Sequence, residues 1–326
     1  MNATHSTCPV ALNTTKYFTI PMYSVALTAG LPLNCLALWG VITHIKKSIV
    51  LSVYVLNVVL ANLLQSLLLP FWIAYSSLNH HWILGQVACV VVGVIHSTNF
   101  YAKNNFLCLI AMDRYIGLIY PMKFHRLQTM SCATKVSVVA WLLVAILCAA
   151  GIWLEMKDLG TWQGNCLDSI QLGKDYAHFK MSTMSLTLFI PCILMGFFYL
   201  RVLLEVRKMT SLHQRVKRRI YGFISVILAS FFLLCTPFQL VSFYKFSWAL
   251  KLEKDKICDF NRSIFNSMYF TWCLATLANI LDPLLYVLLL KDVQADLKDQ
   301  LSFKGHRTEA THKLEDLPLH STTEQT

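Results

Sequence analysis

Long apolar runs alternate with short polar segments over most of the chain. Residues 48–102 contain no Lys, Arg, Asp or Glu, and this stretch is too long for one spanning helix, which needs about 20 apolar residues. The polar cluster at residues 76–81 divides it into two helices. Read in this way, the pattern predicts seven spanning helices, at about 18–45, 51–75, 86–119, 136–154, 181–200, 220–244 and 263–290.

Different patterns occupy the two ends of the chain. Residues 1–17 are mostly polar and lack the apolar stretch of a signal peptide, so the first helix is expected to direct insertion. After the transmembrane domain, 18–290, residues 291–303 alternate apolar and charged side chains, which predicts a short amphipathic helix on the membrane surface. Residues 304–326 are polar and predict a disordered tail. The expected fold class is an all-α membrane protein, a seven-transmembrane helix bundle with an amphipathic eighth helix.

Composition and charge agree with a lipid environment. The chain of 326 residues is 56% hydrophobic and 14% charged, whereas soluble domains carry about a quarter charged residues. The net charge of +11 lies in short segments between apolar runs, so nucleic-acid binding is not indicated. Residues 207–219 hold six basic side chains and no acid, which places this segment in the cytoplasm. We expect a multi-pass plasma-membrane protein with an extracellular N-terminus, in which the sequons at Asn2 and Asn13 carry glycans.

Two motifs stand in predicted helices three and seven. The third ends with Asp113-Arg114-Tyr115, for which a pair of interfacial charges is the alternative interpretation. The seventh contains Asn279-Ile280-Leu281-Asp282-Pro283-Leu284-Leu285-Tyr286; its proline kinks the helix, and an acid within lipid indicates a functional residue. Supporting residues in other helices are Asn34, Trp141, Pro191, Phe231 and Cys235-Thr236-Pro237. Together these motifs resemble those of the rhodopsin-like G-protein-coupled receptors, along nearly the whole chain.

This resemblance implies roles for several residues. In that family the aspartate holds the arginine until activation, and the arginine then contacts a heterotrimeric G-protein. The residues expected to serve coupling and activation are Asp113, Arg114, Tyr115, Asp282, Pro283 and Tyr286. The resemblance also implies arrestin as a partner and a disulfide between Cys89 and Cys166. Cys8 and Cys258 would also lie outside the cell, where oxidation is favoured, so we expect a second bridge between them; two free thiols are the alternative.

A narrower resemblance points to the ligand. The stretches that carry it are 30–36, 50–56, 69–72 and 79–85. They look most like the proton-sensing and lysolipid receptors, and the last stretch looks like the G2-accumulation branch of that group. This implies an extracellular lysophospholipid, oxidised fatty acid or N-acyl amino acid as ligand. The buried acids of the proton-sensing members correspond here to Asn62, Val144 and Asp282, and two of these acids are missing. A lipid anion is therefore favoured, with a proton ligand as the alternative.

Several residues are candidates to meet that ligand. His96, Asn99, Lys103 and Arg114 lie on one stripe of helix three by three-and-four spacing. His96 stands where many family members contact ligand, and a hydrogen-bonded core histidine is the equal alternative. Cations near the helix ends could receive a carboxylate or phosphate, although a single one more often snorkels to the interface. The residues expected to bind ligand are His96, Tyr101, Lys180, Lys245, Arg262 and Tyr269.

The core of the bundle departs from the family. Many rhodopsin-like receptors hold a sodium ion between an aspartate in helix two and a small polar residue in helix three, but Asn62 and Lys103 stand at these positions here. A buried ammonium without a partner is costly, and Asp282 is the expected partner. We expect Lys103 to act as a tethered cation in place of sodium and to raise basal activity; a lysine that fills space or faces lipid is the alternative. The expected core polar network is Asn34, Asn62, Asn99, Lys103, Asn279 and Asp282.

Other function classes agree less well with these motifs. The sequence contains no His-x-x-Glu-His, Gly-x-Ser-x-Gly or phosphate-binding loop, so no catalytic residue, metal site or cofactor is expected. An ion or proton transporter could use Lys103 and Asp282 as its path. Asp113-Arg114-Tyr115 would then have no role, and the chain shows no internal repeat of the kind that builds many transporters.

Overall fold

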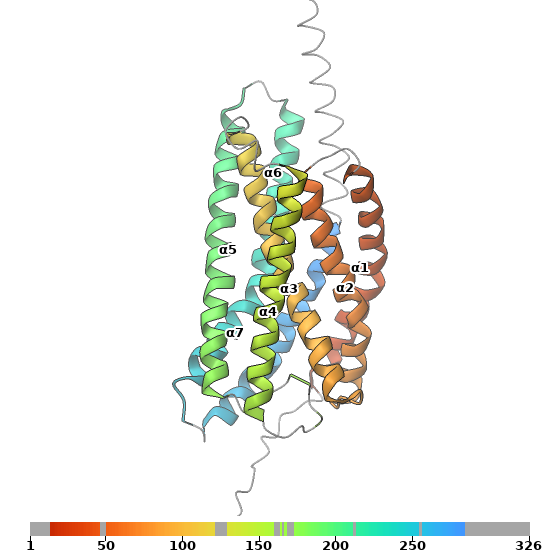
Figure 1. Cartoon of the computed structure of the whole chain (residues 1–326), viewed down its shortest axis with the longest axis vertical. Helices are drawn as coiled ribbons and strands as arrows, with labels where there is room; N and C mark the ends of the chain where they lie inside the picture. Colours follow the sequence, from red (N-terminus) through yellow and green to blue (C-terminus); the bar gives the residue numbers. More distant parts are fainter. Residues whose placement is uncertain are drawn as a thin grey trace, which may run out of the picture.

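A computed structural model of the chain describes residues 14–45, 50–120, 129–159, 164, 166–167, 173–210, 213–253 and 256–283. These residues are almost entirely helical (Figure 1). The helices are α1 (Lys16–Ile45), α2 (Leu51–Ser77), α3 (Gly85–Ile119), α4 (Met130–Leu159), α5 (Lys174–Lys208), α6 (Gln214–Ala229), the π-helix η2 (Ser230–Cys235) and α7 (Thr236–Ala249). One more helix, Lys256–Pro283, follows α7 and is called the 256–283 helix below.

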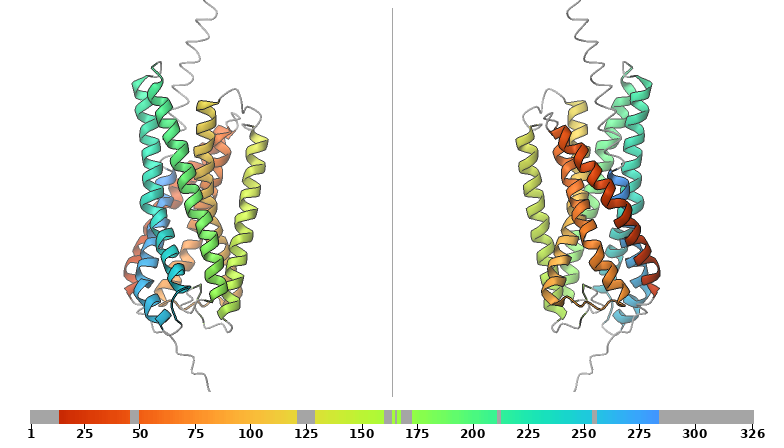
Figure 2. Two further views of the ribbon diagram at one scale, coloured as in Figure 1. Left: turned by 90° about the vertical axis from the view of Figure 1, so that its left-hand side faces the viewer. Right: turned by 90° about the vertical axis from the view of Figure 1, so that its right-hand side faces the viewer.

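These elements form seven rods in the part of the chain that the structure describes, because α6, η2 and α7 follow one another without a break. The rods run side by side along the long axis of the molecule (Figure 1 and Figure 2). This arrangement confirms the all-α, seven-helix bundle that the apolar pattern predicts. The expected eighth helix at 291–303, the tail at 304–326 and the sequon residues Asn2 and Asn13 lie outside the described residues.

Most rods extend beyond the predicted apolar runs. The fourth, predicted at 136–154, is observed as Met130–Leu159, and the sixth, predicted at 220–244, spans Gln214–Ala249. An apolar run marks only the part of a helix that lies in hydrocarbon. Backbone hydrogen bonds continue the helix into the head-group region, where a terminal cation such as Lys208 reaches water.

The third rod differs from the others in polarity. Among the described residues, six rods are long and apolar enough to cross a membrane, and α3 is not one of them. Several of its polar side chains are buried, namely His96, Asn99, Lys103 and Asn104. α3 packs against α2, α4 and α5. It is therefore the central helix of the bundle, and its neighbours shield its polar stripe from lipid.

Large apolar side chains cover the outer faces of the rods. Trp39, Leu143, Ile146, Trp153 and Ile193 are each more than half exposed. In water such a surface would favour aggregation, whereas in a bilayer it faces acyl chains of the same polarity. The polar centre and apolar exterior are what a chain folded in lipid requires.

A π-helix interrupts the sixth rod. Pro237, at the start of α7, has no backbone N–H to continue the helical ladder. Thr236 Oγ1 instead donates a hydrogen bond to the carbonyl oxygen of Phe231 at 3.1 Å. The wider π turn and the proline form a joint between α6 and α7, and Phe231 and Cys235 are buried at this joint.

Candidate functional site

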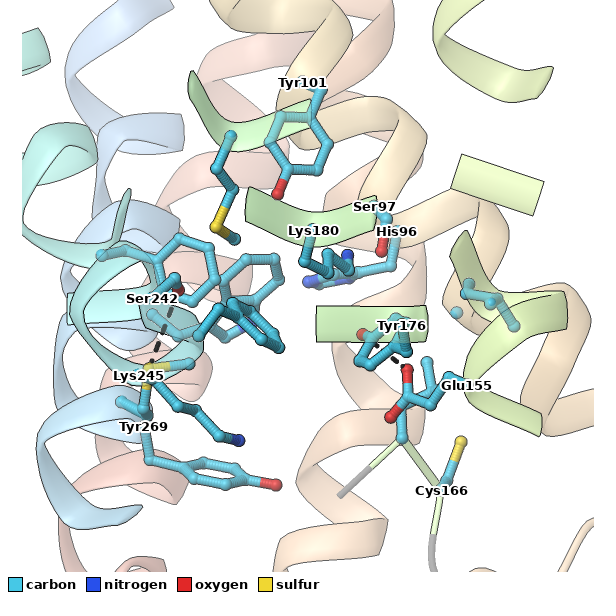
Figure 3. A pocket seen from close by; sticks show the side chains of 18 of the residues that line it. His96, Ser97, Tyr101, Glu155, Cys166, Tyr176, Lys180, Ser242, Lys245 and Tyr269 are labelled. Atoms are coloured by element: carbon cyan, nitrogen blue, oxygen red, sulfur yellow. Dashed lines mark hydrogen bonds between the residues drawn. The ribbon is translucent and has the colours of Figure 1, made fainter. Parts of the chain in front are cut away.

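A cavity of about 190 Å³ lies among the rods, next to the Cys89–Cys166 disulfide. We call this end of the bundle the bridge end. The walls come from α1, α2, α3, α4, α5, α7 and the 256–283 helix (Figure 3). Much of the lining is apolar or aromatic. The polar and charged lining residues include His96, Ser97, Tyr101, Glu155, Tyr176, Lys180, Ser242, Lys245 and Tyr269.

The disulfide shapes one wall of this cavity. Cys89 in the first turns of α3 is bonded to Cys166, with the two Cα atoms 5.6 Å apart. The Cys166 N–H donates a hydrogen bond to Tyr75 Oη at 3.1 Å. Leu167 packs so closely on Gly93 that any side chain at position 93 would collide with it. Cys166 and Leu167 both line the cavity, so the bridge holds lining residues in place.

Cys258 is disulfide-bonded as well. Cys8, its predicted partner, lies outside the described residues, so this pairing stays a prediction. The other described cysteines that do not belong to the Cys89–Cys166 bridge are free thiols.

His96 occupies the aromatic part of the wall. Its ring lies between Trp72 and Trp272, with ring centres at 5.2 and 5.1 Å. Trp72 Nε1 donates a hydrogen bond to His96 Nδ1 at 3.0 Å. Phe238 packs edge-on against Trp272, with 4.2 Å between the ring centres. His96 therefore has both a hydrogen-bonded core position and a place in the cavity wall.

Two ammonium groups and one carboxylate also line the cavity. Lys180 lies on α5, with Nζ 5.5 Å from the centre of the Tyr176 ring, and Lys245 lies on α7. Glu155 on α4 is buried and accepts a hydrogen bond from Tyr176 Oη at 2.9 Å (Figure 3). The lysines can attract an anionic group, while Glu155 repels one from its own part of the cavity.

Most of the predicted ligand residues meet in this cavity, namely His96, Tyr101, Lys180, Lys245 and Tyr269. Arg262 is not among the lining residues of this cavity, which therefore does not support its predicted ligand role. Its guanidinium lies 3.4 Å from Asp259, one turn back on the 256–283 helix, because a side chain at a helix end can turn towards a nearby acid. Glu155 and Tyr176 were missed. The available signal for Glu155 was an acid directly after the predicted span 136–154.

A second polar site lies deeper in the bundle. Lys103 of α3 and Asp282 of the 256–283 helix form an ion pair, with Nζ 3.5 Å from Oδ2 and side chains 0% and 2% exposed. Lys103 Nζ also donates a hydrogen bond to Asn279 Oδ1 at 3.2 Å. Asn62 Nδ2 donates one to Asp282 Oδ2 at 3.3 Å. The lysine therefore faces the core and not lipid, and it meets the acid that the sequence singles out.

The other two asparagines expected in this network, Asn34 and Asn99, differ from each other in their hydrogen bonds. Asn34 Nδ2 donates hydrogen bonds to the carbonyl oxygens of Gly30 and Asn279, each at 2.8 Å, which joins α1 to the 256–283 helix. Asn99 is buried, but its Nδ2 has no hydrogen-bond partner within the described part of the chain. Helical spacing places Asn99 on the same stripe as Lys103 without fixing its contacts, so its place in the polar network stays a prediction.

The opposite end of α3 carries the other motif. Arg114 is half-buried and lies near Asp113 and Tyr199. Tyr115 packs against Phe198 of α5, with 5.2 Å between the ring centres. We call this end of the bundle the Arg114 end. At this end the Arg114 guanidinium lies where α3 packs against α5. Asp282 and Pro283 are the last described residues of the 256–283 helix, and Tyr286 lies outside the described residues.

Comparisons with known proteins found a matching family and several similar receptors. The family described as 7 transmembrane receptor (rhodopsin family) matches residues 33–286. The chain is 26% identical over 282 residues to Probable G-protein coupled receptor 132 from Homo sapiens, covering 86% of this chain and 72% of the relative. It is 28% identical over 286 residues to G-protein coupled receptor 68 from Bos taurus, covering 85% and 75%. It is 28% identical over 296 residues to Chemerin-like receptor 2 from Mus musculus, covering 88% and 79%.

Proposed function

Because the chain belongs to the rhodopsin family of seven-transmembrane receptors, we propose that its cavity binds an amphipathic lipid anion and that binding activates a G-protein. Family membership makes the chain a multi-pass plasma-membrane receptor that couples to G-proteins and is not an enzyme. The proposal adds the ligand: a lysophospholipid, an oxidised fatty acid or an N-acyl amino acid. It also adds the orientation, with the bridge end outside the cell and arrestin binding at the cytoplasmic side.

One observation carries the ligand class. Lys180 and Lys245 place two ammonium groups in a cavity whose other walls are largely apolar and aromatic. Charges in apolar surroundings are stabilised by an opposite charge, and an apolar cavity with a few placed polar groups is typical of small-molecule sites. An anionic head group with an apolar body satisfies both parts of the wall.

The test compares an acid with its uncharged ester. Lys180→Gln and Lys245→Gln are each expected to lower the potency of a lipid acid about tenfold, the equivalent of roughly 1.4 kcal/mol. The ester should lose much less. Arg262→Gln is the matched control, because this cation lies outside the cavity lining. Equal losses for acid and ester, or an equal loss in the control, would contradict the charge contact.

The proton is a second candidate ligand, and one buried histidine favours it. His80 is 1% exposed; its Nε2 is 2.9 Å from Thr15 Oγ1 and its Nδ1 is 3.1 Å from Tyr269 Oη. The His80 ring thus joins the residue before α1, the α2–α3 loop and the 256–283 helix. Signalling by receptor-containing membranes without an added lipid ligand, compared at about pH 6 and about pH 8, tests this candidate. A response that is flat with pH rejects it.

A further inference from the structure

We propose that His96 forms a second polar subsite in the cavity, which takes a neutral hydrogen-bond acceptor, such as a ketone or amide carbonyl, in the body of the ligand. The subsite rests on the proposed function, because it contacts the apolar body of the same ligand. It is separate from the contact between the two lysines and the charged head group. Trp72 is the positioning residue that gives His96 its donor role.

The proton on the histidine ring is placed by Trp72. An indole N–H can only donate a hydrogen bond, and Trp72 Nε1 lies 3.0 Å from His96 Nδ1. Nδ1 must therefore carry a lone pair, and the neutral ring then carries its proton on Nε2. His96 is a donor at Nε2 for as long as the bond from Trp72 persists.

That donor has no hydrogen-bond partner among the described residues. His96 is 2% exposed, and within the described part of the chain no group accepts a hydrogen bond from its Nε2. The same side chain lines the cavity. A buried donor without an acceptor is unfavourable, so a ligand that brings an acceptor oxygen to Nε2 gains more than one that brings a methylene group.

The surroundings select a neutral acceptor. His96 lies between the rings of Trp72 and Trp272, and Phe100 packs against Trp272 with 5.1 Å between ring centres. Transferring a charge to such an aromatic wall is costly. The charged head group has the ammonium groups of Lys180 and Lys245 elsewhere in the lining. A carbonyl, which accepts but does not donate, matches the single donor at Nε2.

The first experiment reads the ring proton directly. Nitrogen NMR of histidine-labelled receptor, with His96 assigned through His96→Phe, should show Nδ1 unprotonated and Nε2 protonated. Trp72→Phe should produce a mixture of the two tautomers. A proton on Nδ1 in the wild type would overturn the proposal. Should Trp72→Phe fail to fold, the wild-type spectrum alone decides this point.

The second experiment uses a probe without a head group. Cyclohexanone has an acceptor oxygen and an apolar body, and methylcyclohexane is its matched control. Cyclohexanone should shift the His96 Nε2–H resonance and leave that of Nδ1 nearly unchanged, whereas methylcyclohexane should shift neither. No shift of Nε2–H at saturating cyclohexanone would overturn the subsite.

The third experiment uses lipids. Within a series of keto acids with the carbonyl at successive positions, one isomer should activate the wild type about 3- to 10-fold more potently than the acid with a methylene there. His96→Phe should abolish this ratio, while Lys245→Gln should lower both potencies and keep the ratio. A ratio unchanged in His96→Phe contradicts the subsite even if both acids activate. If cyclohexanone shifts the His96 Nε2–H resonance but no acid activates the receptor, the lipid-anion function is contradicted and the subsite is still supported.

Discussion

At the scale of single residues, the Lys103–Asp282 pair is the largest departure from an apolar interior. Moving two charges out of water costs several kcal/mol per ion, so such a pair adds little net stability, whereas removing one partner is strongly destabilising. The pair and its amide partners, Asn62 and Asn279, join α2, α3 and the 256–283 helix. We propose that Lys103 is an internal cation that fixes the packing of these three helices.

The first prediction concerns the pairing itself. Asp282→Asn leaves the Lys103 ammonium unpaired and should lower the free energy of unfolding by about 3–5 kcal/mol. Lys103→Met combined with Asp282→Asn should recover most of that loss, because both charges are then absent. Thermal unfolding of the purified receptor in detergent measures the difference. Losses that simply add in the double variant would show that the two charges do not interact.

The second prediction concerns mobile cations. If the Lys103 ammonium occupies the cation position beside Asp282, agonist affinity should be the same in sodium and in N-methylglucamine at equal ionic strength. Lys103→Ser frees the carboxylate of Asp282 and should make affinity depend on sodium. A clear sodium effect on the wild type would contradict the tethered-cation role, and the same comparison reports whether basal signalling falls in Lys103→Ser.

The sequence predicts the chemical role of individual residues better than it predicts their contacts. Lys103 could be matched with Asp282 because a buried charge requires a partner and few acids stand in the predicted helices. The contacts of Asn99 and Arg262 could not be predicted, because helical spacing fixes the face of a residue but not the rotamer of its side chain. Glu155 was missed because an acid at the end of an apolar run is usually an interfacial charge.

At the scale of elements, the number and order of the helices could be predicted from the apolar runs, and their ends could not. The length of an apolar run reflects the thickness of the hydrocarbon core. The ends of a helix depend instead on backbone hydrogen bonds in the head-group region. The π-helix η2 was also missed. Pro237 predicts an interruption there, but nothing in the residues 230–235 distinguishes a π turn from a simple kink.

The third prediction concerns the bridge between α3 and the segment at Cys166. Cys89→Ser should cost about 2–5 kcal/mol and weaken the agonist response, because Cys166 and Leu167 line the cavity. Surface expression and agonist potency measure the two effects. Cys148→Ser is the matched control, since Cys148 is a buried free thiol. Equal losses in both variants would mean that burial, and not the bridge, is responsible.

At the scale of the whole molecule, α3 connects the two functional ends. His96 and Arg114 are 18 residues apart, which is about 27 Å along a helix at 1.5 Å per residue. The Lys103–Asp282 pair lies between them, and the joint at η2 and Pro237 divides the neighbouring rod. A ligand in the cavity can shift the equilibrium at the Arg114 end only if it binds the two states of this bundle with different affinity.

The most direct test of this account measures GTP exchange on a purified heterotrimeric G-protein by the receptor in lipid nanodiscs. A lipid acid should raise the exchange rate for the wild type. Arg114→Ala should abolish the increase while lipid binding measured without G-protein stays unchanged, and the double variant Lys180→Gln, Lys245→Gln should lose both binding and exchange. The account is contradicted if no lipid acid raises the exchange rate. It is also contradicted if Arg114→Ala promotes exchange at the wild-type rate at equal receptor density.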